Sequence, residues 1–417
     1  MTRGTERLVN RLIAASIFSV CVFQTFSDGA IIVTSNTVRE FLDGRTGKLI
    51  YTKFEGDDGF KNGRSLWYID FSAATLVEKQ VIYTSNTEPR NPIISSDGEW
   101  VVYNTLTQGG GRGDNGECKS YVCRLQENAT ATFIANGAQP HWWVKPGTTE
   151  EYVIYTSGDL EQDWQMRWPP NEGGTSTSMI RLVNKQPSGS GSVLCYYYLN
   201  AGRTKNGEYM FTSGRATGIF RFNATVTQNA TPLSMQEWDN AGCNPSTSPH
   251  QETADLRFMQ NCETHDHFAI RSVDGTITMD HYKTDDGNKY WDTPEWSTHT
   301  DYATVVGSAV EISPPFDVYL FNTVTGAELR VIDGNCYWPH LWVGPDVNAV
   351  EQPRSGRVRD VNGIGMRGAQ AAVYYDITGR EIAGKRIRGA ANALYMVGAG
   401  NATGSNINGR AVHMKGE

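Results

Sequence analysis

The stretch NPIISSDGEWVVYNT, residues 91–105, decides the predicted fold of the chain. A short strand opens at Pro92, a turn follows at Asp97-Gly98, and aromatic and β-branched residues fill positions 100–105. An Asp-Gly pair between two runs of this kind is a strong signal for a β-hairpin. The stretch therefore predicts one hairpin with its tip at Gly98.

Variants of this hairpin recur along the chain. Three further copies are well formed and two are weaker, in the segments 138–157, 200–214, 242–261, 295–308 and 336–346. Repeats of a few strands spaced roughly 40–50 residues apart are typical of β-propellers. The last repeat holds only one strand, 338–343, and the first repeat lacks its opening strand. We therefore predict a six-bladed β-propeller in which 338–343 completes the first blade and removes the exposed sheet edges.

Composition supports an all-β fold class. The 417 residues include 43 glycines, 19 tyrosines and 11 tryptophans, as expected for many short strands joined by tight turns. Almost no stretch shows a sustained helical period. The net charge of −8 disfavours nucleic acid as a partner, because phosphate binding needs a clustered positive field.

The N-terminal segment predicts export. MTRGTERLVNR is positively charged, and the apolar run LIAASIFSVCVF that follows it is too short to span a bilayer. This order is that of a signal peptide, which we place at residues 1–29. The mature protein is then expected outside the cytoplasm, secreted or at the cell surface, with a periplasmic location left open and no membrane span.

Removal of the signal peptide leaves six cysteines, an even number that permits disulfides in an exported chain. Cys243 and Cys262 flank one hairpin and are predicted to form a cross-strand disulfide. Cys118 and Cys123 enclose a short predicted loop and are a second candidate pair. The two cysteines of non-neighbouring repeats are expected to be buried thiols, Cys195 and Cys336.

The P-x-x-S-x-D-G pattern and the strand after it, residues 92–103, resemble the repeat of TolB-like, WD40-like six-bladed propellers. The resemblance covers residues 45–346 and implies a fold, because such propellers serve as enzymes, scaffolds and sugar binders. Three copies depart from the pattern at their turns, in 204–207, 248–251 and 297–300.

The C-terminal region is predicted to be a linker, 347–368, followed by a small β-sandwich-like module, 369–417. AAVYYDITGREIAGKRI and ALYMVGAG indicate short strands. VYYDITGR (373–380), followed by LYMV (394–397), is similar to the C-terminal sorting domain of proteins exported by the bacterial type IX system. That resemblance implies a bacterial host; the alternative is a β module that packs on the propeller. Four Asn-Ala-Thr sequons would be incidental in a bacterium, at Asn128, Asn223, Asn229 and Asn401.

Four histidines occupy repeated positions. His141 and His340 each follow a strand-opening proline, and His250 and His299 hold the turn position of Asp97. Histidines that converge on the axis would bind Mn, Ca or Zn, as in the oligogalacturonate lyases of propeller fold, which this chain resembles in architecture only. The alternative is a structural role, in which His141 and His340 pack beside tryptophans and His250 and His299 form hydrogen bonds with the turn backbone. The pair His265 and His267 is a weaker metal signal.

The long connections of the predicted propeller gather on one face and combine aromatic rings with carboxylates. They carry Trp164, Trp168, Tyr290, Trp291, Asp159, Asp163 and Asp285. Rings stack on sugars and carboxylates accept hydroxyl hydrogen bonds, so this mixture favours a polysaccharide or surface glycan. The alternative is that these loops cap the channel and bury their own tryptophans.

The sequence therefore favours a non-enzymatic glycan-binding module. A metal-assisted polysaccharide lyase or glycoside hydrolase is the first alternative, although no catalytic residues can be singled out. A TolB-like scaffold with a protein partner is the second.

Overall fold

The computed structural model describes sixteen segments of the chain. They are 29–54, 63–84, 87–107, 118–157, 162–169, 179–184, 202–212, 218–221, 223, 234–237, 243–262, 264–282, 287–311, 313–346, 373–375 and 395–397. The chain divides into two units, Met1–Val350 and Glu351–Glu417. The predicted signal peptide lies outside the described residues except for Gly29. No helix in the described segments is long and apolar enough to cross a membrane.

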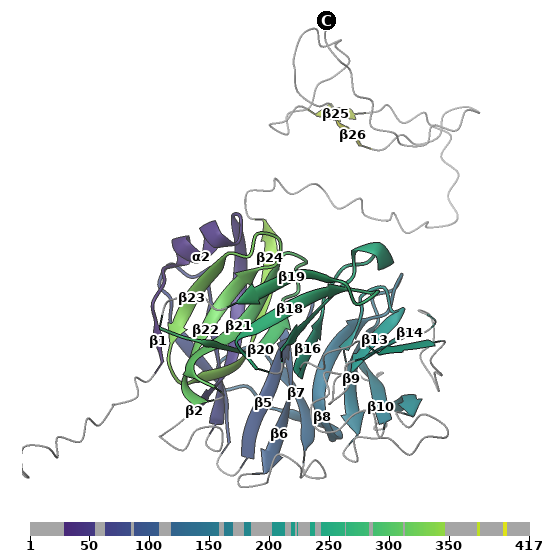
Figure 1. Cartoon of the computed structure of the whole chain (residues 1–417), viewed down its shortest axis with the longest axis horizontal. Helices are drawn as coiled ribbons and strands as arrows, with labels where there is room; N and C mark the ends of the chain where they lie inside the picture. Colours follow the sequence, from purple (N-terminus) through teal and green to yellow (C-terminus); the bar gives the residue numbers. More distant parts are fainter. Residues whose placement is uncertain are drawn as a thin grey trace, which may run out of the picture. The chain divides into compact units, whose positions relative to one another are not determined.

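The first unit is all-β and propeller-like, with antiparallel sheets that follow one another along the chain (Figure 1). One sheet has the order β24 (Cys336–Asp346), β2 (Arg45–Phe54), β3 (Gly63–Asp70) and β4 (Glu78–Tyr83). The next contains β5 (Thr87–Ile94), β6 (Trp100–Thr107), β7 (Lys119–Arg124), β8 (Thr132–Val144), β9 (Glu151–Ser157), β10 (Gln162–Trp168) and β11 (Met179–Asn184).

Three further sheets complete the first unit. The first has the order β12 (Gly202–Arg203), β13 (Tyr209–Thr212), β14 (Gly218–Arg221) and β15 (Ser234–Glu237). The second has the order β16 (Cys243–Thr247), β17 (Arg257–Asn261), β18 (His267–Ser272) and β19 (Ile277–Tyr282). The third has the order β20 (Tyr290–Trp296), β21 (Tyr302–Val310), β22 (Ser313–Asn322) and β23 (Glu328–Asp333), with β1 (Ala30–Ile31) on its outer edge beside β23. Two short helices accompany them, α2 (Ser35–Phe41) and the 3-10 helix η3 (Thr253–Asp255).

The C-terminal strand of the first unit closes onto its N-terminal sheet. β24 pairs antiparallel with β2, with Leu341 opposite Leu49 and His340 opposite Ile50. Figure 1 shows β24, green, beside β2, purple. The predicted pairing of the last strand with the first repeat is confirmed, and β2 is covered on both sides, by β24 and by β3.

The strand-opening prolines lie at bulges. The residue before the proline has a left-handed backbone, φ between 43° and 50°, in five inner strands, at Asn91, Gln139, Asn244, Thr293 and Trp338. The pairing register shifts at the same place in all five. Proline has no N–H for the ladder, so it is accommodated where the ladder is interrupted. The strands also begin earlier than predicted, since β5 starts at Thr87 rather than near Pro92.

The reference turn contacts the closing strand. Asp97 Oδ1 accepts hydrogen bonds from Ser95 Oγ at 2.5 Å and from the Glu99 N–H at 2.9 Å. Trp342 of β24 donates its indole N–H to the Ser96 carbonyl at 3.1 Å. Gly98 has φ +74°, and a Cβ there would lie 2.6 Å from the Trp342 ring. Glycine is therefore required by both the backbone and the neighbouring indole.

Gly98→Ala is expected to destabilise the protein by more than Gly147→Ala. Gly147 has a similar φ, +73°, but nothing lies within 4 Å of its absent Cβ. Each substitution forces a left-handed alanine, at about 1–3 kcal/mol, and Gly98→Ala also displaces Trp342. Urea unfolding measures both, and equal losses would contradict the contact with Trp342.

Hydrophobic clusters fill the spaces between neighbouring sheets. Ile50 and Leu66 of the first sheet pack with Val101 and Tyr103 of the next. Leu49 on the same strand packs toward β21, β22 and β23 in another cluster. Alternate residues of β2 therefore face two different sheets, as the two-residue period of a strand requires.

The predicted disulfides are wrong. Cys123 and Cys262 are free thiols, which excludes both predicted bridges. Residues 119–124 form β7 rather than a loop, so Cys118 and Cys123 lie about 16 Å apart at ~3.3 Å per residue, too far for a bridge. Cys243 pairs with Asn261, not with Cys262, and consecutive strand residues point to opposite faces.

The buried-thiol prediction is confirmed for Cys336, which is free and fully buried. Cys195 lies outside the described residues. In the second unit, β25 (Val373–Tyr375) pairs antiparallel with β26 (Tyr395–Val397). These strands lie where the sequence predicted them, and the rest of the predicted module lies outside the described residues.

Candidate functional site

The predicted aromatic face is not formed as expected, because its tryptophans belong to strands. Trp168 ends β10, is 8% exposed and packs edge-on against Trp100 at 5.7 Å. Trp291 lies in β20, is 0% exposed and packs against Phe268 and Tyr319. The assignment of Tyr290 and Trp291 to a long connection is wrong, since Tyr290 already begins β20. Neither buried ring presents a face to a sugar.

The remaining residues of that prediction are placed only in part. Asp163 and Trp164 lie on β10, opposite Thr156 and Tyr155 of β9. Tyr290 is partly exposed at the start of β20. Asp159 and Asp285 lie outside the described residues. Among the predicted platform residues whose side chains the structure describes, Trp168 and Trp291 are buried and Tyr290 is partly exposed.

His250 and His299 serve their turns. His250 Nδ1 lies 2.8 Å from Ser248 Oγ, which repeats the contact between Ser95 and Asp97 in the reference turn. His299 Nδ1 accepts the Asp301 N–H at 3.2 Å. Burial is the main cause that lowers the pKa of both rings. These contacts agree with the structural alternative for the two histidines.

His141 and His340 lie on inner strands. His340 Nδ1 accepts the Ile94 N–H at 3.1 Å and so joins β24 to β5. Burial lowers the pKa of His141 to about 4, and burial together with the charge of His141 lowers the pKa of His340 to about 3. Both rings are therefore neutral near pH 7. Within the described segments, none of the four predicted histidines belongs to a group of three metal-ligating side chains.

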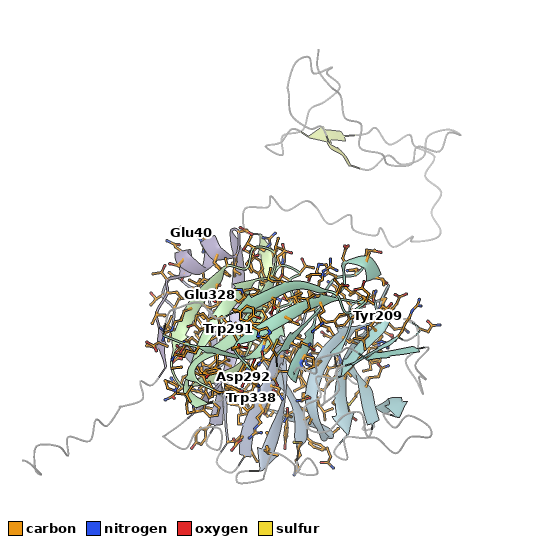
Figure 2. All side chains as sticks on the ribbon, in the orientation of Figure 1. Glu40, Tyr209, Trp291, Asp292, Glu328 and Trp338 are labelled. Carbon is orange, nitrogen blue, oxygen red and sulfur yellow. The ribbon has the colours of Figure 1, made fainter. Side chains whose placement is uncertain are left out.

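A buried carboxylate, Asp292, joins three sheets. Its Oδ1 accepts from Asn244 Nδ2 at 2.6 Å, from Asn261 Nδ2 at 3.0 Å and from the Thr293 N–H at 2.8 Å. Tyr337 donates its hydroxyl to Oδ2. Asp292 is 5% exposed, and Figure 2 labels it beside Trp291 on β20. Sequence reasoning missed this residue, whose partners are distant in the chain.

A second carboxyl, that of the partly buried Glu295, follows on the same strand. Glu295 Oε1 accepts a hydrogen bond from Ser246 Oγ at 2.7 Å, and Ser246 Oγ in turn accepts one from the Trp296 N–H at 2.8 Å. Burial raises the pKa of Glu295 to about 8, and the hydrogen bond from Ser246 opposes the shift. The folded protein therefore holds this proton near neutral pH.

The raised pKa of Glu295 predicts that the free energy of unfolding depends on pH. The folded pKa, about 8, exceeds the ordinary 4.5, so the folded state binds more protons between these values. The free energy of unfolding then decreases as pH rises from 4.5 to 8, by up to about 1.4 kcal/mol per unit. We expect Glu295→Gln to remove this component and to be more stable than the parent at pH 8.

The measurement is urea unfolding of both proteins at intervals from pH 5 to 9. The difference between the two proteins removes the contributions that other titrating groups make to both. One such group is Glu151, because burial raises its pKa to about 7. Parallel pH profiles for the parent and Glu295→Gln would show that Glu295 titrates normally.

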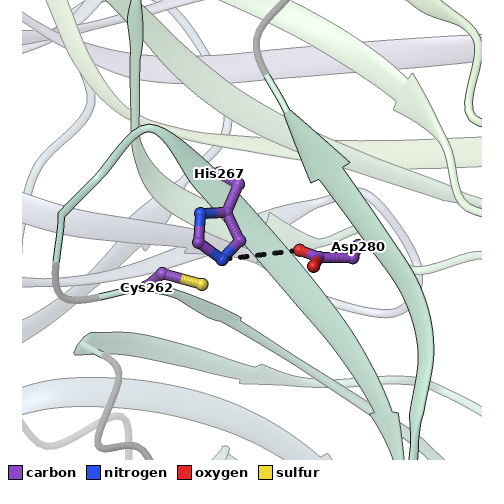
Figure 3. A group of neighbouring side chains, drawn as sticks. All are labelled: Cys262, His267 and Asp280. Atoms are coloured by element: carbon purple, nitrogen blue, oxygen red, sulfur yellow. Dashed lines mark ion pairs between the residues drawn. The ribbon is translucent and has the colours of Figure 1, made fainter.

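A cluster of possible metal ligands lies where the chain turns from β17 into β18. Cys262, His267 and Asp280 each offer one ligand atom, and these atoms lie within 4.8 Å of one another (Figure 3). His267 Nε2 is 3.5 Å from Asp280 Oδ1. Burial and the carboxylates of Asp280 and Asp266 raise the pKa of Cys262 to about 12. The thiol is therefore protonated when no cation is present.

The two histidines of the His-x-His pair have different surroundings. His265 is buried, with Nδ1 3.1 Å from Asn261 Nδ2 and 3.6 Å from Asp292 Oδ1. His267 faces Cys262 and Asp280. A hairpin flanked by Cys262 and containing two histidines was a visible signal, but assigning Cys262 to a disulfide hid it.

The fold and these sites define an all-β, propeller-like protein. No protein-family model matches the chain, and no curated protein does. Among solved structures, TolB from Acinetobacter baumannii is similar over 71% of this chain and 66% of its own, with 12% identity and a TM-score of 0.47.

Two other solved structures are similar in the same way. A putative TolB from Agrobacterium tumefaciens shares 13% identity over 72% of this chain and 99% of its own, with a TM-score of 0.41. The β-propeller domain of Cps50 (Swd1) from Myceliophteria thermophila shares 10% identity over 66% of this chain and 82% of its own, with a TM-score of 0.40.

Proposed function

We propose that the chain is a six-bladed β-propeller that acts outside the cytoplasm as an interaction scaffold for a protein partner. The sheet order supports six four-stranded blades: β24 with β2–β4, β5–β8, β8–β11, β12–β15, β16–β19 and β20–β23, with β8 shared by two of them. The export signal and the C-terminal sorting module belong to this proposal and rest on the sequence.

One observation carries the scaffold role. Large side chains are exposed at strand ends on one edge of the sheets: Tyr83 ends β4, Tyr282 ends β19 and Val310 ends β21, each 53–60% exposed. In the proposed blades, second and fourth strands end at the same face, where the long connections also lie. Tyrosine is enriched in protein interfaces, where its ring supplies contact area at low entropic loss.

The interior supports a structural role for the groups that would otherwise suggest catalysis. His340 and Asp292 are bonded to backbone and side-chain partners on other strands. Two tryptophans of the aromatic platform expected for a glycan are buried, Trp168 and Trp291. Recognition on loops above a rigid scaffold fits these observations best.

Site-specific photo-crosslinking tests the proposal. A benzophenone amino acid replaces Tyr83 or Tyr282 on the proposed face, and Val324 or Ile277 at the other ends of the sheets as exposed controls. The protein is irradiated in an extract of the cells that produce it. We expect a discrete, protease-sensitive adduct from the first two positions, reduced by excess parent protein but not by excess Tyr83→Ala/Tyr282→Ala variant.

Other outcomes overturn the proposal. A protease-resistant, glycosidase-sensitive adduct would favour the glycan alternative. Equal adducts from all four positions, or no adduct from any of them, would show that the face defined by Tyr83 and Tyr282 does not bind a protein partner.

A further inference from the structure

We propose that Cys262 Sγ, His267 Nε2 and an Asp280 carboxylate oxygen bind a divalent transition-metal ion, with Zn²⁺ as the best chemical match. Zinc takes thiolate, imidazole and carboxylate ligands in tetrahedral geometry. The three candidate ligand atoms lie within 4.8 Å of one another, so small side-chain rotations suffice to bring them around one ion. This site differs from the one predicted from His141, His250, His299 and His340.

The backbone holds His267 and Asp280 on adjacent strands and Cys262 directly after the end of β17. The Cys262 N–H donates to the His267 carbonyl at 3.1 Å across the hairpin, and His267 is the first residue of β18. Asp280 on β19 pairs with Ala269 on β18. Ligands on neighbouring strands are positioned more precisely than ligands on loops.

The histidine is already oriented for a metal, which is an independent observation. His267 Nδ1 lies 2.6 Å from Asp266 Oδ1, so this nitrogen carries the proton and donates it to the carboxylate. Nε2 is then the nitrogen that faces Asp280, as Figure 3 shows. Metal-binding histidines commonly hold their second nitrogen on a carboxylate in this way. Tyr282 stacks on the same imidazole at 4.4 Å and fixes its plane.

The ligand set also selects the metal. Ca²⁺ and Mg²⁺ prefer oxygen ligands, whereas a thiolate with an imidazole favours zinc and related ions. Three protein ligands leave a fourth position for water or for a group from another molecule, and Asp280 is exposed to solvent. The metal-free explanation is an ion pair between His267 and its two carboxylates, with a free thiol beside it.

Metal binding has a defined proton balance. The Cys262 thiol forms a bond to the ion as thiolate and passes its proton to the buffer, while His267 donates the Nε2 lone pair and Asp280 a carboxylate oxygen. No electron is transferred. Titration in two buffers of different ionisation enthalpy then reports one proton released per ion bound near pH 7.

The experiment uses full-length, reduced protein titrated with ZnCl₂ and with CoCl₂. We expect one equivalent of Zn²⁺ to bind, and Co²⁺ to give the near-ultraviolet charge-transfer band of a cobalt–thiolate bond. Cys262→Ser should lose that band, and His267→Gln and Asp280→Asn should bind at least about 100-fold more weakly. Asp266→Asn should bind about 10–100-fold more weakly, because it only orients the imidazole.

Asp274→Asn is the matched control. It removes another exposed carboxylate of the same sheet, at the turn between β18 and β19, and should bind Zn²⁺ like the parent. Thermal melting without metal verifies that each variant is folded. No stoichiometric binding to the folded parent, or a cobalt–thiolate band that survives Cys262→Ser, would overturn the proposal. The photo-crosslinking result is independent of either outcome.

Discussion

A chain that ends at Asn335 is expected to lose its cooperative fold. The truncation removes β24, which pairs with β2 and supplies Cys336, Tyr337, Leu341 and Val343 to the interior. Full burial of one such side chain contributes about 1.5–3 kcal/mol, so four contribute about 6–12 kcal/mol. That sum is comparable with the whole stability of a typical domain, about 5–15 kcal/mol.

Removal of β24 also breaks contacts beyond its own sheet. Thr304 of β21 donates its hydroxyl to the Pro339 carbonyl at 2.8 Å, and the Ile94 N–H of β5 loses its acceptor on His340. β2 keeps β3 on one side and becomes an edge strand on the other, which makes it a template for association with other chains. Aggregation is therefore expected together with the loss of the melting transition.

The matched control ends at Val350, the last residue of the first unit. It lacks the second unit but keeps β24, and it should melt near the temperature of the full chain. Circular dichroism and size-exclusion chromatography compare the three proteins. An unchanged melting temperature for the chain ending at Asn335 would mean that β24 does not hold the first sheet in place.

The overall architecture could be predicted because its signals are local and repeated. Each hairpin has its own turn, and the unpartnered strand near Trp338 indicated the closure that β24 and β2 form. The position of each inner strand was less accurate. Proline indicated a strand start, but the five prolines lie at bulges inside or near the strands, where the ladder is interrupted.

The sites could not be predicted to the same degree, because they depend on register and on residues far apart in sequence. A shift of one residue places Asn261, not Cys262, opposite Cys243. The tyrosine hydroxyl that reaches Asp292 lies 45 positions away along the chain. Trp291 was assigned to a long connection between predicted strands, yet it lies in β20 and is fully buried. The roles of His250 and His299 in their turns followed from the repeat alignment.

Asp292→Ala is expected to lower the free energy of unfolding by about 5 kcal/mol. The substitution removes the hydrogen bonds that Asp292 accepts from Asn244 Nδ2, Asn261 Nδ2 and the Tyr337 hydroxyl, and loss of a buried acceptor costs about 1–3 kcal/mol for each donor. Losses of this size are rare for single substitutions and arise from broken buried networks. Urea unfolding at constant pH measures the loss.

Two companion variants separate the network from the mere loss of a carboxylate. Asp292→Asn keeps one acceptor oxygen, and its amide can donate to the Tyr337 oxygen, so its loss should be less than half that of Asp292→Ala. Asp274→Ala removes an exposed carboxylate that accepts from Ser272 and Thr276 within its own turn, and should cost about 1 kcal/mol or less. Because Asn244, Asp292 and Tyr337 belong to three different sheets, the Asp292→Ala loss should also appear as reduced hydrogen-exchange protection in β16 and β24. Equal losses for Asp292→Ala and Asp274→Ala would show that Asp292 does not join these sheets.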